Sequence, residues 1–149
     1  MGKAICFDMD GTIANLYQVE NWKEKLNVGN SLPYLTAEPL FDMAELAEIL
    51  RQLQESEWHI QIITWGSMTA TSCQLDEIRQ AKLEWLDMQG FPYDGFHCVK
   101  YGTTKARALN NKYEQAILID DNEKVRKTWK LGQAIDPMDN LIDFLKGLM

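Results

Sequence analysis

Acidic side chains gather at two places in this 149-residue sequence, each directly after a short apolar run. Asp8 and Asp10 follow the first run, and Asp120 and Asp121 follow a later one. Carboxylates that converge repel one another, and a hard divalent cation such as magnesium relieves the repulsion because it accepts oxygen ligands. Beside such a cation one carboxylate can attack phosphorus and another can transfer the proton. These acids therefore indicate phosphoryl-transfer chemistry.

The elements that must position these acids alternate between short apolar runs and longer amphipathic stretches. This alternation predicts the α/β class, a three-layer sandwich with a mostly parallel sheet. Ligands bind such a sheet beyond the carboxyl ends of its strands, which is where the acids are expected. The predicted strands are residues 4–7, 58–64, 96–99, 116–119 and 133–135, and the predicted helices are 41–54, 71–89, 104–112, 122–130 and 141–148.

Other polar residues are expected at the same edge of the sheet. Thr64 ends the second strand, and Lys105 opens a predicted helix, with Lys100 as the second choice for a lysine near the acids. Aspartates after strands also form turns and cap helices, so neither acidic motif alone distinguishes a site from a turn. The full set, in this order and each at a strand end, favours a site.

Composition limits the classes of partner. The net charge is −7, which offers no basic stripe for duplex nucleic acid or an anionic membrane. Cys6, Cys73 and Cys98 are odd in number and lack zinc-site spacing, so free thiols in a reducing compartment are expected. The first apolar run is too short for a signal peptide, and no run approaches the roughly 20 residues of a membrane span. We expect one cytoplasmic domain over residues 1–149, with residues 15–40 as a small flap that includes a short helix near 19–26.

The motifs together resemble those of the haloacid dehalogenase (HAD) superfamily of phosphohydrolases, from Lys3 to about Leu131. The matching segments are Asp8-Met9-Asp10-Gly11-Thr12, then Thr64, Lys105 and Ile119-Asp120-Asp121. The resemblance implies a Rossmann-like HAD fold with a minimal cap. It also implies a magnesium-dependent phosphatase, a phosphoric monoester hydrolase that works through an aspartyl-phosphate on Asp8.

The resemblance assigns the site residues. It implies catalytic roles for Asp8, Asp10, Thr64 and Lys105, substrate binding by Thr12, Trp65 and Gly66, and magnesium binding by Asp8, Asp10, Asp120 and Asp121. Asp8 would be the nucleophile, and Asp10 the general acid and base, with its backbone carbonyl on the metal. Asp121 would contact the metal directly and Asp120 would support it, although the two could exchange.

The first residues, FDMDGTIANLY, also resemble the start of the 5′(3′)-deoxyribonucleotidases. This implies a 5′-nucleotidase-like enzyme whose substrate is a small phosphorylated metabolite, with nucleotides as candidates. Tyr17, Trp22, Tyr34 and Trp65 could stack on a base, or Trp22 and Tyr34 could simply pack the flap onto the domain. An open site would also accept a phosphorylated polynucleotide end or a phosphoprotein, although the acidic charge disfavours the polynucleotide.

Two other functions remain open at this stage. A phospho-receiver signalling module uses similar residues, but it carries its phosphorylated aspartate after a middle strand, whereas here the paired acids follow the fourth run. A catalytically idle binding protein on the same fold is the other alternative. Steady phosphate release would exclude the receiver, and loss of function in Asp8→Asn would exclude the idle protein.

Overall fold

A parallel five-stranded sheet forms the centre of the computed structural model, which describes residues 2–149. Met1, the first residue of the predicted domain, lies outside the described residues. Each neighbouring pair of strands runs parallel. Across the sheet the order is β5 (Gly95–Val99), β4 (Trp58–Trp65), β1 (Gly2–Phe7), β6 (Tyr113–Ile119) and β7 (Ala134–Ile135). The predicted α/β class is confirmed.

The central strand β1 explains why its sequence reads as a continuous apolar run. Ile5 and Phe7 face one side of the sheet and join one hydrophobic cluster, while Ala4 and Cys6 face the other side and join a second. All four side chains are fully buried. A parallel strand covered on both faces needs apolar residues at every position rather than at alternate ones.

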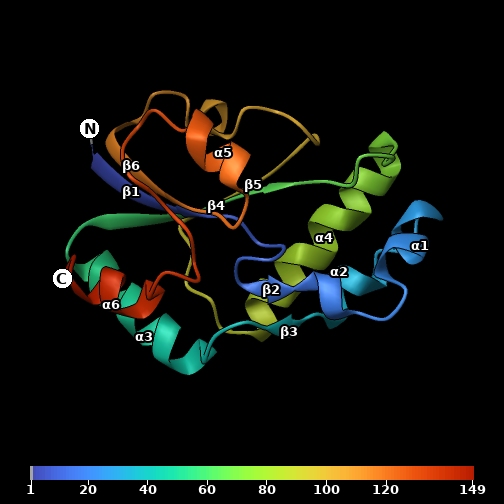
Figure 1. Cartoon of the computed structure of the whole chain (residues 1–149), viewed down its shortest axis with the longest axis horizontal. Helices are drawn as coiled ribbons and strands as arrows, with labels where there is room; N and C mark the ends of the chain where they lie inside the picture. The colour runs from blue at the N-terminus through green and yellow to red at the C-terminus, as the bar shows by residue number, and fades with distance from the viewer. Residues whose placement is uncertain (1) are drawn as a thin grey trace.

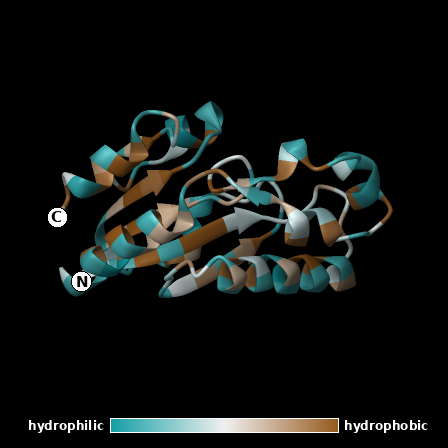
Figure 2. Cartoon of the chain, turned by 90° about the horizontal axis from the view of Figure 1, so that it is seen from below, coloured by the Kyte–Doolittle hydropathy of each residue, from teal (hydrophilic) through white to brown (hydrophobic). Residues whose placement is uncertain are grey.

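Helices cover both faces of the sheet, and the predicted three layers are confirmed (Figure 1). Helices α3 (Met43–Glu55), α4 (Ser72–Met88) and α6 (Leu141–Lys146) contribute to the cluster on the Ile5 face. The opposite face packs against α5 (Glu123–Thr128) and a 3₁₀ turn, η2 (Lys105–Leu109). Figure 2 shows the hydrophobic strands between helices of mixed polarity. Within residues 2–149, none of the helices combines the length and apolar character needed to cross a membrane.

The flap is more structured than the sequence predicted. Two short strands, β2 (Ala14–Asn15) and β3 (Glu38–Pro39), pair antiparallel and close its base. Between them lie the 3₁₀ turn η1 (Leu16–Gln18) and helices α1 (Trp22–Asn27) and α2 (Leu32–Thr36), where one helix was expected. Helix α2 packs on α4, and this contact holds the flap beside the carboxyl ends of the strands.

The predicted helices 104–112 and 122–130 are the ones shortened most in the structure. The segment 104–112 forms only the five-residue turn η2, because Asn110 and Asn111 take positive φ angles of 50° and 56° and end it. Helix α5 stops at Thr128 rather than residue 130. The reason is Trp129, which turns inward and donates from its indole nitrogen to the carbonyl of Ala116 at 2.9 Å.

Candidate functional site

The order of the strands places two acidic segments side by side. The chain runs from β1 outward to β4 and β5, and then crosses to the other side of β1 to form β6 and β7. Asp8 follows β1 and Asp120 follows β6, and the amide of Asp8 donates to the carbonyl of Ile119 at 3.0 Å. This is the point of an open α/β sheet where the strand order reverses and ligands bind.

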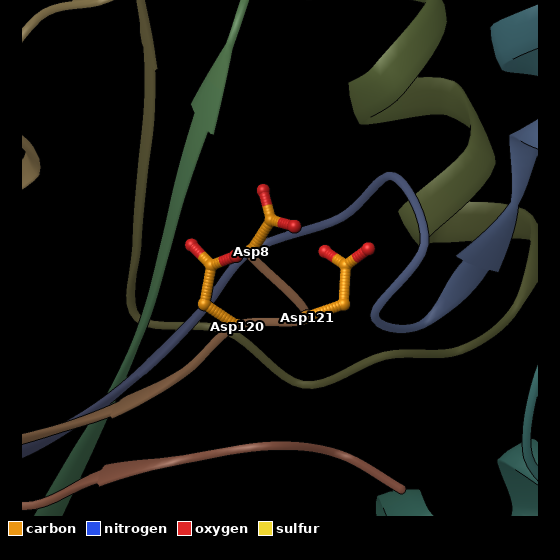
Figure 3. Close-up of side chains that lie close together, drawn as sticks. All are labelled: Asp8, Asp120 and Asp121. Carbon is orange, nitrogen blue, oxygen red and sulfur yellow. The ribbon is translucent and has the colours of Figure 1, made fainter. Parts of the chain in front are cut away.

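Three carboxylates converge there (Figure 3). One oxygen from each of Asp8, Asp120 and Asp121 lies within 4.8 Å of the other two. Burial, followed by the charge of Asp8, raises the pKa of Asp121 to about 7. Such crowded carboxylate oxygens are the hard donors that magnesium prefers, and a cation would relieve the repulsion that raises this pKa. The residues present therefore fit a divalent cation.

Lys105 joins two of the three acids. Its Nζ atom donates to Oδ1 of Asp8 at 2.9 Å and to Oδ2 of Asp120 at 2.7 Å. Burial alone would lower the pKa of Lys105, but the two carboxylates outweigh it and raise that pKa. The remaining oxygen of Asp120 accepts from the amide of Asn122 at 2.9 Å. Both Asp120 oxygens therefore accept hydrogen bonds, and the choice of Asp121 as the direct metal ligand stays a prediction. Lys100, the second choice, is exposed.

Thr12 forms hydrogen bonds to residues of both acidic segments. Its hydroxyl lies 2.9 Å from Oδ2 of Asp8 and 3.2 Å from Oδ1 of Asp121, and it accepts from the Asp121 amide at 3.1 Å. The residue is fully buried, so the structure places the predicted substrate-binding Thr12 beneath the site. The neighbouring Gly11 has φ +82°, and a Cβ atom there would meet the Asp121 carboxylate and the ring of Tyr17.

Asp10 lies apart from the three-carboxylate group and pairs with a second buried lysine, Lys82 of α4. The Nζ atom of Lys82 donates to Oδ2 of Asp10 at 3.0 Å, to Oγ1 of Thr64 at 2.7 Å and to the carbonyl of Trp65 at 2.8 Å. Burial raises the pKa of Asp10, and the charge of Lys82 partly opposes that rise. Because an ammonium group only donates, the Thr64 hydroxyl must accept from it.

The sequence analysis missed Lys82. Its side chain is fully buried and lies 4.6 Å from the ring centre of Tyr34 in the flap. A signal was present, because residues 78, 82 and 85 recur at helical spacing on the buried stripe of α4. A lysine on such a stripe is almost never left without a partner.

A cavity of about 500 Å³ opens above the acids. The predicted residues that line it are Asp8, Asp10, Trp65, Gly66, Asp120 and Asp121 at or just after the strand ends, and Lys105 of η2. The flap, the segments after β4 and β5, and the start of α5 also line it, with Tyr17, Trp22 and Tyr101 among their residues. Among the predicted site residues, Thr12 and Thr64 are buried and do not line it.

The comparisons with known proteins give structural neighbours only. No protein-family model matches the chain, and no curated protein sequence is similar enough to count as a match. One similar solved structure belongs to a Pnkp1/Rnl/Hen1 complex, with a TM-score of 0.64 and 15% identity over 91% of this chain and 46% of that one. Another belongs to the Pnkp1/Rnl/Hen1 RNA repair complex, with a TM-score of 0.58 and 14% identity over 91% of this chain and 44% of that one. The chain therefore spans less than half the length of either neighbour, and at this identity the likeness establishes the fold alone.

These findings correct four expectations. The assignment to the HAD superfamily is wrong, because the neighbours are chains of an RNA repair complex and neither sequence comparison supports that superfamily. The expected function, a magnesium-dependent HAD phosphatase acting on metabolites, is wrong for the same reason, and so is the nucleotidase class. The expected partner, a small phosphorylated metabolite with no duplex nucleic acid, is also wrong, since the neighbours are chains of an RNA repair complex.

Proposed function

We propose that this chain acts on RNA ends and removes a terminal phosphate, as a hydrolase of phosphate monoesters that uses magnesium. The observation that carries the proposal is the convergence of Asp8, Asp120 and Asp121 with Lys105 on the floor of an open cavity. RNA as the substrate rests on the fold shared with chains of an RNA repair complex. The arrangement supplies what phosphate chemistry needs, namely a cation site, a fixed ammonium group and carboxylates.

Different residues around the cavity have different roles in the proposed reaction. Hydrolysis breaks the bond between phosphorus and the terminal ribose oxygen, joins the oxygen of water to phosphorus, and leaves a proton on the ribose oxygen. Lys105 stabilises negative charge on the phosphate beside Asp8, and Asp10, which lines the cavity, is the candidate for moving the proton. Magnesium held by Asp8 and Asp121 would add positive charge at the phosphate oxygens.

An acidic chain can bind the end of an RNA without contacting the phosphates along the whole strand. The net charge of −7 disfavours many simultaneous phosphate contacts along a backbone. A terminal phosphate needs only the local positive charge of a cation and Lys105, and Lys23 adds another at the cavity wall. We therefore propose recognition of the end rather than of the helix.

The proposed location is the cytoplasm, which suits free thiols at Cys6, Cys73 and Cys98.

Phosphate release from RNA tests the proposed function. Short RNA oligomers carrying a monoester phosphate at the 5′ or the 3′ end are incubated with the protein and magnesium, and inorganic phosphate is measured. We expect release from one of these ends, at least about tenfold faster than from a mononucleotide, and none after chelation of the metal. Release from mononucleotides alone, or from neither RNA end, would contradict the proposal.

The acidic group also predicts how magnesium and pH act on stability. Asp121, whose pKa is raised from 3.8 to about 7, binds more protons in the folded than in the unfolded protein between those values. This group therefore makes the metal-free protein less stable as pH rises through that window. At about pH 7.5 we expect magnesium to raise the melting temperature by several degrees, and at about pH 5.5 by much less, because protons then compete for Asp121.

Thermal melting of Asp121→Asn provides the check on this prediction. The variant should lose most of the magnesium-dependent rise, whereas Asp139→Asn, an exposed aspartate outside the cavity, should keep it. An equal rise in Asp121→Asn and in the parent protein would show that magnesium binds elsewhere.

A further inference from the structure

Two pairs of aromatic rings line the cavity above the acids. Tyr17 and Trp22 belong to the flap, with ring centres 5.1 Å apart at an angle of 69°. Trp65 ends β4 and Tyr101 follows β5, and their ring centres are 5.0 Å apart at 53°. The four rings come from three segments that are distant in the sequence but share one cavity.

One ring of each pair lies next to the charged residues at the strand ends. A Cβ atom on Gly11 would touch both the ring of Tyr17 and the carboxylate of Asp121, which places Tyr17 next to the acidic group. On the other pair, the ring of Trp65 lies 5.2 Å from Nζ of Lys105, the ammonium group bonded to Asp8. A nucleotide whose phosphate lies on Asp8 and Lys105 would therefore bring its base among these rings.

The two tyrosine rings are exposed, and the Trp65 ring is held in place. Tyr17 and Tyr101 are 49% and 46% exposed, so neither is needed to fill the core. Trp65 is fixed by a hydrogen bond of 2.9 Å from its indole nitrogen to the carbonyl of Thr103. Burial, followed by the charges of Asp10 and Asp121, raises the pKa of Tyr17, so its hydroxyl stays protonated in the cavity. Rigid exposed aromatic faces are the surfaces on which unpaired bases stack.

We infer that Tyr17, Trp22, Trp65 and Tyr101 form a subsite for the terminal base of an unpaired RNA end. The inference rests on the proposed function, because that function places the phosphate at the acids. The cavity of about 500 Å³ lies within the roughly 300–1,000 Å³ range of small-ligand pockets, so a terminal nucleotide has room. A base stacked on these rings cannot at the same time pair and stack within a helix, so the subsite selects a frayed or single-stranded end.

Binding of matched RNA oligomers tests the subsite. The two RNAs are identical except that one lacks the terminal base, and each carries a fluorescent label at the far end and a terminal phosphate. Fluorescence anisotropy, with calcium in place of magnesium, gives the dissociation constants. Loss of the base should weaken binding to the parent protein about tenfold or more.

Protein variants show whether the rings cause this effect. Tyr17→Ala and Tyr101→Ala should weaken binding of the intact RNA and shrink the difference between the dissociation constants of the two RNAs. Tyr93→Ala, a half-buried tyrosine outside the cavity, should leave the difference unchanged.

The possible outcomes separate the subsite from the proposed hydrolysis. Equal binding of the two RNAs by the parent protein overturns the subsite, whether or not phosphate is released. An undiminished difference in both Tyr17→Ala and Tyr101→Ala, with circular dichroism showing folded protein, also overturns it. Base-dependent binding that these variants abolish, without phosphate release from either RNA end, would support the subsite and contradict the proposed function instead.

Discussion

Asp8→Asn should slow phosphate release from RNA by at least about 10³-fold and leave the protein folded. The substitution removes a negative charge from the three-carboxylate group, so both the cation site and the carboxylate nearest the phosphate are impaired. Asparagine has nearly the same size and shape, and the Asp8 side chain is mostly enclosed, so packing around it should be preserved. Initial rates at saturating magnesium, together with a thermal melt, measure both effects.

The fold should survive because the neighbouring contacts remain satisfied. Lys105 keeps its 2.7 Å bond to Asp120, and an asparagine oxygen in place of Oδ1 can still accept from the ammonium group. The amide nitrogen in place of Oδ2 can donate to the Thr12 hydroxyl, which reverses that hydrogen bond without breaking it. One fewer carboxylate also lowers the repulsion at the site. Asp139→Asn is the matched control and should retain the parent rate. Parent-level turnover in Asp8→Asn would mean that the chemistry occurs elsewhere.

The sheet and its acidic edge could be predicted because each depends on local sequence. In β1 every residue from Ala4 to Phe7 is apolar since both faces of the strand are covered, and the acids begin where the strand ends. The same applies to β6 and Asp120. Once strands are parallel, their carboxyl ends share an edge, so the convergence of Asp8 with Asp120 and Asp121 follows from connectivity.

Lys105 could be predicted as the lysine beside Asp8, but the partner of Asp10 could not. The bond from Lys82 to Asp10 joins residues 72 positions apart and depends on how α4 lies across the strand ends. The flap has no periodic pattern, so its paired strands and second helix were missed. The error about family and substrate has a related origin. Acids at strand ends indicate a kind of chemistry, whereas the substrate depends on the other residues that line the cavity. Tyr101 is one of these residues, and the sequence analysis did not consider it.

Lys82→Met should destabilise the folded protein by about 3–5 kcal/mol, the cost of removing one partner from a buried ion pair. The Lys82 side chain is fully buried, and it donates to the Asp10 carboxylate, the Thr64 hydroxyl and the Trp65 carbonyl. Methionine fills a similar volume but donates nothing, so these three acceptors lose a partner and Asp10 keeps an uncompensated charge. Urea unfolding gives the free energy of unfolding. Phosphate release should fall as well, because Asp10 loses the contact that orients it.

A double-mutant cycle with Asp10→Asn shows whether the ion pair is the cause. If the uncompensated carboxylate dominates the cost, Lys82→Met should destabilise the Asp10→Asn protein by at least about 1 kcal/mol less than it destabilises the parent. Lys127→Met is the control, because Lys127 pairs with Glu123 on the surface and its side chain is 73% exposed. That change should stay within about 0.5 kcal/mol. Additive effects of Lys82→Met and Asp10→Asn would assign the cost to packing and to the bonds with Thr64 and Trp65. Lys82 would then hold the end of β4 in place without orienting the proton-transferring acid.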